Sequence, residues 1–432
     1  MMKPIPDNAS FLAIDIAKRR NEVLLEIPDT KRRRRMTVLN TRADHDRLAD
    51  AMHALKRPVV VGFEATGNYH RPIAWRLLSE GFDLRLIPSV GLARTREALH
   101  NSWDENDSKD AQVILHMMTI GAEQFYHDPL VHGTNDIQEL SKTHDIVSKS
   151  KTELLHRLQT HYLPLYFPEA ERFRNNTRSD WFFALLERFP TLASITVYSK
   201  EAFITEAWDV VGKKVSKERL ISDIYATAQE SIALPADLNS QAIAMYRMVL
   251  GEARHLIRQR DEIERAADTL LADHPDYRRL RQLPGIGPIH GLVILAEAGN
   301  LRRFPHHRQF LKYCGFDLAT HQSGQFRGRT KLSKYGNARL RRAFWMAGQI
   351  AIRQKDNSFR DKFERYIARD RDNKDLRRKA LTAIAAKMAR VAHAIIKSGE
   401  DYRPFVERMR PAEEPLSVGA VRARQHEANA TL

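Results

Sequence analysis

Hydrophobic residues near the start of the chain fall into three short runs of strand-forming residues. The runs are FLAIDIA (11–17), NEVLLEI (21–27) and MTVLN (36–40), and the segments between them are charged or contain proline. Short runs that are rich in β-branched and apolar residues and are bounded by turn residues are typical of β-strands. The pattern therefore predicts a three-stranded meander, with the cationic stretch 31–35 in its second turn.

After the meander, the pattern alternates between helix and strand. Thr41 and Asp44 resemble an N-capping pair, and apolar residues follow them at helical spacing. VVVGFEA (59–65) is typical of a strand buried on both faces, 71–80 of a helix, and 83–87 of another strand. Three strands, helix, strand, helix, strand is the order of the ribonuclease H-like α/β fold.

The middle of the chain has a seven-residue periodicity. The series within 238–271 is Ala242, Val249, Leu256, Ile263 and Leu270, and Leu140, Val147 and Leu154 repeat the interval within 137–163. Such spacing predicts a long, coiled-coil-like helix whose apolar face has to be covered by the helix at 137–163 or by a second copy of the chain. The segment 164–237 between them, with its Trp and Phe residues among prolines and charges, predicts a small helical insertion.

A Gly-rich turn before an apolar helix opens the last part of the chain at 283–300, and 376–398 is an Ala-rich helical stretch. We therefore expect an α/β domain at 10–125, a helical connector at 130–275 with its insertion at 164–237, a mainly helical C-terminal domain at 278–402, and a disordered tail at 411–432.

Composition excludes several classes of protein. Of the 432 residues, 43% are hydrophobic, which argues against chain-wide disorder. The single cysteine, Cys314, excludes an intramolecular disulfide framework and a Cys-rich zinc module, and it suits a reducing cytosol. The sequence has no signal-peptide pattern and no apolar run of the ~18 residues that a membrane span needs. We expect a cytoplasmic, nucleoid-associated protein without a membrane partner.

The charge balance indicates a polyanionic partner. The chain carries 70 Lys and Arg against 54 Asp and Glu, a formal net charge of +16. Residues 301–350 contribute +10 of this, because they hold eleven cations and a single acid, Asp317. A surface of this kind binds phosphate, and the C-terminal part of the chain should be its basic pole.

Four carboxylates are candidates for a metal site. Asp15 stands in the middle of the apolar first strand, Glu64 ends the buried strand GFE, and Asp107 and Asp110 lie three apart on one face of the helix they open. Such acids can hold two Mg²⁺ ions around a phosphodiester, since oxygen-only ligands favour Mg²⁺ over zinc.

Each of these residues also has a structural explanation. An aspartate in a strand is more often a hydrogen-bonded structural residue, and Asp107 and Asp110 could be acids favoured by the helix dipole. Asp104 and Glu105 are nearby alternatives that fall before the helical face begins. As a set in a ribonuclease H-like strand order, however, the four acids favour the metal interpretation.

The C-terminal part offers candidate phosphate contacts. Gly285 and Gly287 precede a helix whose N-terminal N–H groups could meet a phosphate, as in helix-hairpin-helix DNA binders, although the turn could also serve packing alone. Cations and aromatic rings alternate in the stretch that follows, a pattern of backbone tracking and base stacking. The candidate cations are Arg327, Arg329, Lys331, Lys334 and Arg339, and the rings are Phe304, Phe310, Tyr313, Phe316 and Tyr335.

A serine in this stretch could act as a nucleophile. Ser323 stands in a polar loop close to several cations, which would stabilise charge developing on phosphorus. Most loop serines are only turn residues, and Ser333 is a competing choice.

Together these segments resemble a known family. AIDIAK, GFEATGNYH, NDSKDA, LPGIGP, AEAGNLRRFPHHRQFLKYCGF, HQSG, KLSKYGNARLRRAFWMA and KALTAIAAKMARVAHAIIKSGEDY, in this order, are similar to motifs of the DEDD-type transposases of the IS110 insertion-sequence family. The resemblance covers about residues 10–125 and 278–402. It implies a RuvC-like N-terminal domain, a coiled-coil connector and a C-terminal transposase domain with a nucleophilic serine.

The resemblance also implies a function and partners. Asp15, Glu64, Asp107 and Asp110 would form the Mg²⁺-binding tetrad, and Ser323 would link covalently to a DNA 5′-phosphate. The partners would be donor DNA, target DNA and a guide (bridge) RNA encoded beside the gene. The protein would act as a dimer or tetramer, which favours pairing of the heptad faces between copies.

Two other functions remain open at this point. A Mg²⁺-dependent Holliday-junction resolvase would use the carboxylates alone and would need no covalent serine. A non-catalytic nucleic-acid-binding protein would keep the fold without the reaction.

Overall fold

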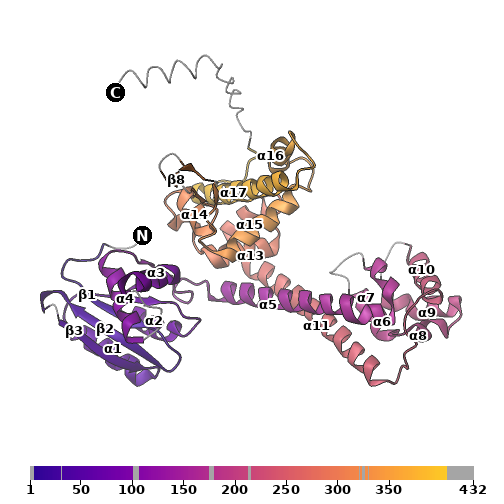
Figure 1. Ribbon diagram of the computed structural model, residues 1–432, viewed down its shortest axis with the longest axis horizontal. Helices are drawn as coiled ribbons and strands as arrows, with labels where there is room; N and C mark the ends of the chain where they lie inside the picture. Colours follow the sequence, from indigo (N-terminus) through magenta and orange to yellow (C-terminus); the bar gives the residue numbers. More distant parts are fainter. Residues whose placement is uncertain are drawn as a thin grey trace, which may run out of the picture. The chain divides into compact units, whose positions relative to one another are not determined.

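The computed structural model describes residues 4–30, 32–100, 107–174, 180–212, 216–320, 322–323, 326–328 and 330–405. The chain divides into two compact units, Met1–Asp136 and Ile137–Leu432, and Figure 1 shows the helices and strands of each. The predicted tail at 411–432 lies outside the described residues. Among the described helices, none is both long enough and apolar enough to cross a membrane.

A six-stranded sheet forms the centre of the first unit. Its strands are β1 (Ser10–Asp15), β2 (Arg20–Ile27), β3 (Arg32–Leu39), β4 (Val59–Glu64), β5 (Asp83–Ile87) and β6 (Gln124–Phe125), and their order is β3-β2-β1-β4-β5-β6. The first three strands pair antiparallel, whereas β1, β4 and β5 run parallel. The predicted meander and the ribonuclease H-like strand order are confirmed.

Alternating side chains of the strands build a core on each face of this sheet. Leu12 and Ile14 pack on one face under α1 (Arg42–His53) and α2 (His70–Ser79), and Ala13 packs on the other under α4 (Asp107–Thr119). The predicted start of α1 is confirmed, because the Thr41 side chain accepts a hydrogen bond from the backbone N–H of Asp44. β4 is buried along its length except at its last residue, as expected for a strand covered on both faces.

The first unit differs from the sequence prediction in three elements. β3 begins at Arg32, so residues 32–35 of the cationic stretch expected in a turn pair with β2 as a strand, and the short 3-10 helix Pro28–Thr30 lies in the turn before them. Helix α3 (Ser89–His100) and the two-residue strand β6 were not predicted. Strand β6 has two exposed residues and α3 a weak apolar pattern, so neither leaves a clear periodic signal.

Long helices and a helical insertion open the second unit. They are α5 (Asn135–Arg157), a π-helical turn (Leu158–Tyr162), α6 (Leu163–Tyr166), a 3-10 turn (Pro168–Phe173), α7 (Trp181–Arg188), α8 (Leu192–Thr196), α9 (Lys200–Val211), α10 (Lys217–Gln229) and α11 (Gln241–Leu271). The predicted long helix and the helical nature of the insertion are confirmed.

The apolar face of α11 is covered within the chain. Val249 and Leu256 share one hydrophobic core with Val147 and Leu154 of α5 and with the insertion. The expected cover by a second copy is therefore wrong for this face. The seven-residue series also drifts from the buried face at its ends, because Leu270 is 49% exposed while its neighbour Leu271 is buried. A straight helix departs from a strict heptad repeat in this way.

The rest of the second unit is a helical body around one core. It contains α12 (Pro275–Arg281), α13 (Pro288–Ala298), a 3-10 turn (Leu301–Arg303), α14 (His307–Cys314), α15 (Ala338–Ala351), α16 (Ser358–Ile367) and α17 (Lys374–Ser398). Two small ladders interrupt the helices, β7 (Leu318–Ala319) with β10 (Lys331–Leu332) and β8 (Gln322–Ser323) with β9 (Phe326–Arg327). The mainly helical C-terminal region is confirmed.

Candidate functional site

Two of the predicted carboxylates stand at neighbouring strand ends. Asp15 is the last residue of β1 and Glu64 the last of β4, and the parallel register pairs Ile14 with Phe63 directly before them. Asp15 follows Ala13 by two positions, and Ala13 packs in the core under α4. Glu64 follows Gly62 by two positions, and Gly62 abuts Met118 of α4. Because alternate residues of a strand share a face, both acids lie on the face that α4 covers. The parallel pairing thus brings these two acids to one edge of the sheet.

The position of Asp15 corrects the sequence prediction. Asp15 ends its strand and is half-buried, whereas the sequence placed it in the middle of an apolar strand. The carboxylate therefore avoids the cost of complete burial that this interpretation implied. An acid at a strand's carboxyl end is better placed to face a substrate than one inside the sheet.

Helix α4, which covers the same face, carries Asp110. It begins at Asp107, as predicted, and packs on the sheet through residues such as Ala111 and Ile114. The Nε of Arg96, on α3, donates to Oδ1 of Asp110 at 2.6 Å, and the two side chains are 17% and 14% exposed. Asp110 therefore has a cationic partner in this structure.

Three of the predicted carboxylates have the donor chemistry of divalent-cation ligands. Asp15, Glu64 and Asp110 offer only oxygen donors, which suits a hard cation. Within the described residues, no group of three or more His, Cys, Asp or Glu side chains lies close enough together to hold a metal ion. The Asp107 side chain and the alternatives Asp104 and Glu105 lie outside the described residues.

One further acid at this edge was missed by the sequence analysis. Glu22 of β2 lies directly opposite Asp15 in the antiparallel register, and its carboxylate accepts hydrogen bonds of 3.1 and 3.2 Å from the Thr37 hydroxyl. Directly opposed residues share a face of the sheet. The register of the predicted meander could have revealed it, but the hydrogen bonds to Thr37 indicate a structural role.

The two glycines of the predicted phosphate-binding turn have different roles. Gly285 has φ +87°, and a Cβ there would overlap the backbone of α15, at 2.9 Å from the nitrogen of Ala351 and closer still to the Ala347 carbonyl. Gly285 thus serves a close backbone approach, and this packing role explains the glycine without a phosphate. Gly287 caps the N-terminus of α13 and has no atom within 4 Å of a Cβ position, so it keeps its candidate role.

The predicted cations also separate into two groups. Lys331 and Lys334 are exposed. Arg339 is engaged inside the unit, where it pairs with Glu297 and donates to the carbonyl and hydroxyl oxygens of Ser141 at 2.8 and 2.9 Å. Arg339 therefore links α13, α15 and α5 in this structure, which gives it a structural explanation. The Arg327 side chain and Arg329 lie outside the described residues.

Most aromatic rings of the basic stretch belong to the core. Phe304, Phe310 and Phe316 are buried and Tyr313 packs against them, so hydrophobic packing explains these four rings. Tyr335 is 57% exposed. It remains the one candidate of the five for stacking on a base.

The two candidate serines also differ. The Ser333 hydroxyl hydrogen-bonds to the Asp317 carboxylate and accepts from the backbone N–H of Tyr335 at 3.3 Å, which makes it part of a turn. The backbone of Ser323 lies in the β8–β9 ladder opposite Phe326, while its side chain lies outside the described residues. Ser333 thus has a structural explanation.

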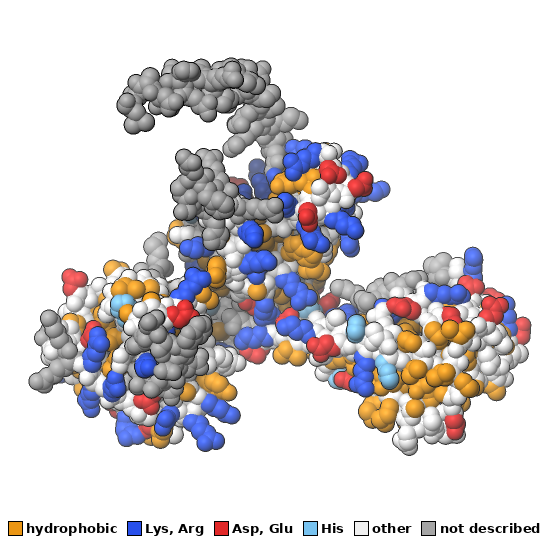
Figure 2. All heavy atoms as spheres, in the orientation of Figure 1, with side chains coloured by type: hydrophobic (Ala, Val, Ile, Leu, Met, Phe, Trp, Pro, Cys, Tyr) orange, Lys and Arg blue, Asp and Glu red, His pale blue; other side chains and the backbone are white. Residues whose placement is uncertain are grey.

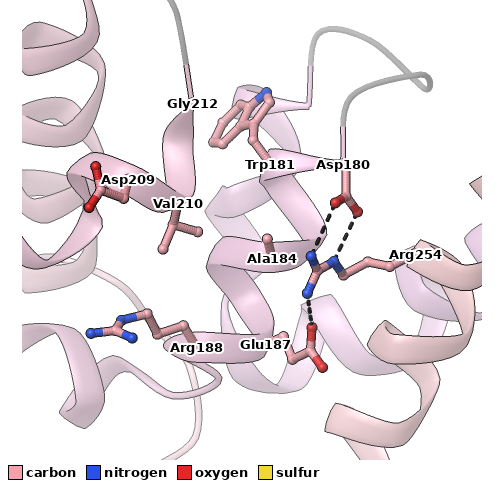
Figure 3. Close-up of a pocket in the computed structure, with 9 residues that line it drawn as sticks. All are labelled: Asp180, Trp181, Ala184, Glu187, Arg188, Asp209, Val210, Gly212 and Arg254. Carbon is pink, nitrogen blue, oxygen red and sulfur yellow. Dashed lines mark hydrogen bonds and ion pairs between the residues drawn. The ribbon is translucent and has the colours of Figure 1, made fainter. Parts of the chain in front are cut away.

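A concavity of about 780 Å³ lies in the helical insertion (Figure 3). Arg254 projects between Asp180, which accepts from its Nε and Nη2 at 2.9 and 3.1 Å, and Glu187, which accepts from its Nη1 at 2.6 Å. Hydrogen bonds raise the pKa of Arg254, and the bond to Asp180 contributes more than the bond to Glu187. These charges satisfy one another, and none of the predicted site residues lines the concavity.

Two segments of the chain match models of known protein families. Residues 12–168 match the model of the DEDD-type transposase domain of IS110, and residues 277–364 match the model described as "Transposase IS116/IS110/IS902 family". A relative from Streptomyces coelicolor, "Insertion element IS110 uncharacterized 43.6 kDa protein", is 25% identical over 74% of this chain and 78% of its own length. The "Transposase for insertion sequence element IS1111A" of Coxiella burnetii is 22% identical over 69% of each chain.

Among solved structures, RuvC of T. thermophilus in complex with a Holliday junction substrate aligns over 27% of this chain and 98% of its own, with 10% identity and a TM-score of 0.20. The assignment therefore rests on the two matched models and the two relatives. The chain belongs to the IS110 family of DEDD transposases, which are enzymes that cleave and rejoin DNA.

Proposed function

We propose that this transposase recombines donor and target DNA through the carboxylates of its first unit and Ser323 of its second, guided by a bridge RNA. The observation that carries the proposal is the adjacency of Asp15 and Glu64 on the face that α4 covers. In this proposal, two strand ends and the first turn of one helix would supply the four acids that a ribonuclease H-like nuclease requires. The matches to transposase models in both units support the division of the reaction between them.

The four acids would hold Mg²⁺. Asp15 and Glu64 would ligate from the strand ends, and Asp107 and Asp110 from the first turn of α4. When bound, divalent cations offset the charge of the scissile phosphodiester and orient the attacking and leaving oxygens. To ligate the cation, Asp110 has to give up its hydrogen bond with Arg96. The freed guanidinium is then a further cation close to the phosphate.

Ser323 would be the nucleophile. Its Oγ attacks phosphorus and loses its proton, the bond from phosphorus to the DNA 3′ oxygen breaks, and that oxygen takes up a proton. The products are a 5′-phosphate ester on Ser323 and a free 3′ hydroxyl, and the reverse step rejoins strands without ATP, because the phosphodiester bond energy is conserved. The structural engagement of Ser333 supports the choice of Ser323.

Partners follow from this scheme. Recombining two duplexes needs several active sites, so the protein would act as a dimer or tetramer, with the carboxylates of one copy near Ser323 of another. Exposed Lys331 and Lys334 and the N-terminus of α13 at Gly287 would contact nucleic-acid phosphates. A guide RNA would supply the sequence specificity.

A covalent adduct tests the proposal. Protein incubated with end-labelled DNA and guide RNA should yield a labelled band on denaturing electrophoresis, and peptide mapping should place the label on Ser323. Ser323→Ala should remove the band and keep nucleic-acid binding. Ser333→Ala is the matched control and should keep the adduct. An adduct on Ser333 would move the nucleophile, and free 5′-phosphate ends without any adduct would favour the resolvase function instead.

A further inference from the structure

The cationic stretch near the start of the chain forms an ordered edge strand. β3 reads RRRRMTVL and pairs only with β2, since it is the outermost strand of the sheet. Arg33, Arg34 and Arg35 are exposed. Figure 2 shows Lys and Arg side chains gathered along the edge of the first unit where β3 and α1 run. Consecutive exposed arginines give this strand a concentrated positive charge, which attracts polyanions.

The register assigns each arginine to a face of the sheet. Arg35 lies opposite Leu24, which packs in the core under α4, and Arg33 lies opposite Glu26 on the same face. Arg34 lies opposite Leu25, which packs in the core under α1 and α2. Arg33 and Arg35 therefore share the face of Asp15 and Glu64, whereas Arg34 is on the other face.

Arg35 lies close to the carboxylate Asp15 along the sheet. Leu24 of β2 lies opposite Arg35 of β3 on one side and opposite Ala13 of β1 on the other. Ala13 precedes Asp15 by two residues. Two strand spacings and two residues along a strand place the backbone of Arg35 roughly 12 Å from that of Asp15. A phosphate on Arg35 would thus be within a few nucleotides of a phosphodiester at the carboxylates.

The charges on this strand are only partly neutralised within the chain. Arg33 pairs with Glu26 at 2.7 Å. Within the described residues, no ion pair is formed by Arg34 or Arg35. Neighbouring arginines on one face are about 7 Å apart, which is inside the screening distance of about 8 Å at physiological salt, so their repulsion persists. A polyanion would relieve it.

We propose that Arg33 and Arg35 form a phosphate-binding track for the DNA duplex that flanks the scissile phosphodiester, and this rests on the proposed function of the carboxylates. DNA is the occupant because it is the substrate of the transposase and the track shares the face of the carboxylates. Edge protection alone would not require arginines on this particular face, since charge on either face blunts a strand edge.

A matched pair of substitutions in the full-length protein tests the track. Arg35→Gln and Arg34→Gln remove the same charge from adjacent exposed positions of one strand, but from opposite faces of the sheet. Among the residues that the structure describes, neither arginine has an ion-pair partner. Binding of a labelled DNA duplex carrying one end of the insertion element is measured against salt. Arg35→Gln should weaken binding several-fold and lower the magnitude of the log K versus log salt slope by about 0.9, the value of one lost phosphate contact. Arg34→Gln should leave both near wild type.

Three outcomes decide the proposal. Equal effects of the two substitutions, or none, would overturn it. A loss seen with an RNA duplex of the same sequence but not with DNA would overturn it in favour of RNA binding. Increased aggregation of both variants with unchanged DNA binding would assign the arginines to edge protection. A failure of the proposed function can be told apart from a failure of the track. In that case Asp15→Asn would cleave DNA fully, whether or not Arg34 or Arg35 is substituted. Thermal unfolding of each variant checks that β3 remains in place.

Discussion

The carboxylate edge of the first unit and the basic stretch of the second were both predicted as nucleic-acid sites, but they differ in how the fold uses the predicted residues. In the first unit, acids separated by 49 positions come to adjacent strand ends, Asp15 and Glu64, because parallel pairing aligns them. In the second unit, Gly285, Arg339 and four of five rings serve packing. The comparison teaches that sheet topology can bring residues of separated motifs next to one another, whereas charge density alone does not distinguish a binding residue from a structural one.

The largest expected effect concerns the carboxylate edge. Asp15→Asn should reduce DNA cleavage by more than about 100-fold, because in the proposed function it removes a metal ligand and even outer groups of metal sites contribute 10- to 100-fold. Glu22→Gln is the matched control on the neighbouring strand, and its cleavage rate should stay within a few-fold of wild type. Equal losses in the two variants would extend the site to Glu22, and full activity of Asp15→Asn would remove Asp15 from it. Circular dichroism confirms that both variants fold.

The second prediction separates the two turn glycines. Gly285→Ala should lower the free energy of unfolding of the second unit by about 3 kcal/mol, since a Cβ there meets the α15 backbone and the φ of +87° is strained for alanine. Gly287→Ala, at φ −85° with open space, should lower it by less than about 1 kcal/mol. Urea denaturation followed by tyrosine and tryptophan fluorescence measures both. Similar stability of the two variants would contradict the packing role of Gly285.

The sequence predicted the elements better than their partners. The meander, α1 with its Thr41 cap, β4 and α11 were predictable because each has strong local periodicity or a capping signal. The salt bridge of Arg96 with Asp110 was not, since α3 was itself missed and side-chain pairing across elements leaves no periodic signal. The strand character of the arginines at the start of β3 was missed because β-propensity depends on cross-strand neighbours more than on the residue itself.

The third prediction divides the cations of the basic stretch by their partners. Lys331→Gln with Lys334→Gln should lower the magnitude of the salt slope for duplex DNA by about 1.8, at about 0.9 for each lost contact, and leave stability unchanged. Arg339→Gln should leave the slope unchanged and reduce stability by about 2 kcal/mol, because Glu297 loses a charged hydrogen-bond partner. A flatter slope in Arg339→Gln would return this residue to the binding surface.

The smallest expected effect tests whether Arg96 competes with a cation for Asp110. The pair stands at 2.6 Å and is mostly shielded from solvent, and an ion pair of this kind contributes about 1 kcal/mol. Arg96→Gln should therefore tighten Mn²⁺ binding, measured by calorimetry on the DNA-free protein, by roughly fivefold, which is the ratio that corresponds to 1 kcal/mol. The opposite sign would show that Arg96 orients Asp110 for the cation. Arg94→Gln, two residues earlier on the same helix, is the charge-matched control and should leave the affinity unchanged. If both variants tightened binding equally, the effect would belong to the general positive field of α3, and the specific pairing of Arg96 with Asp110 would carry no part of it.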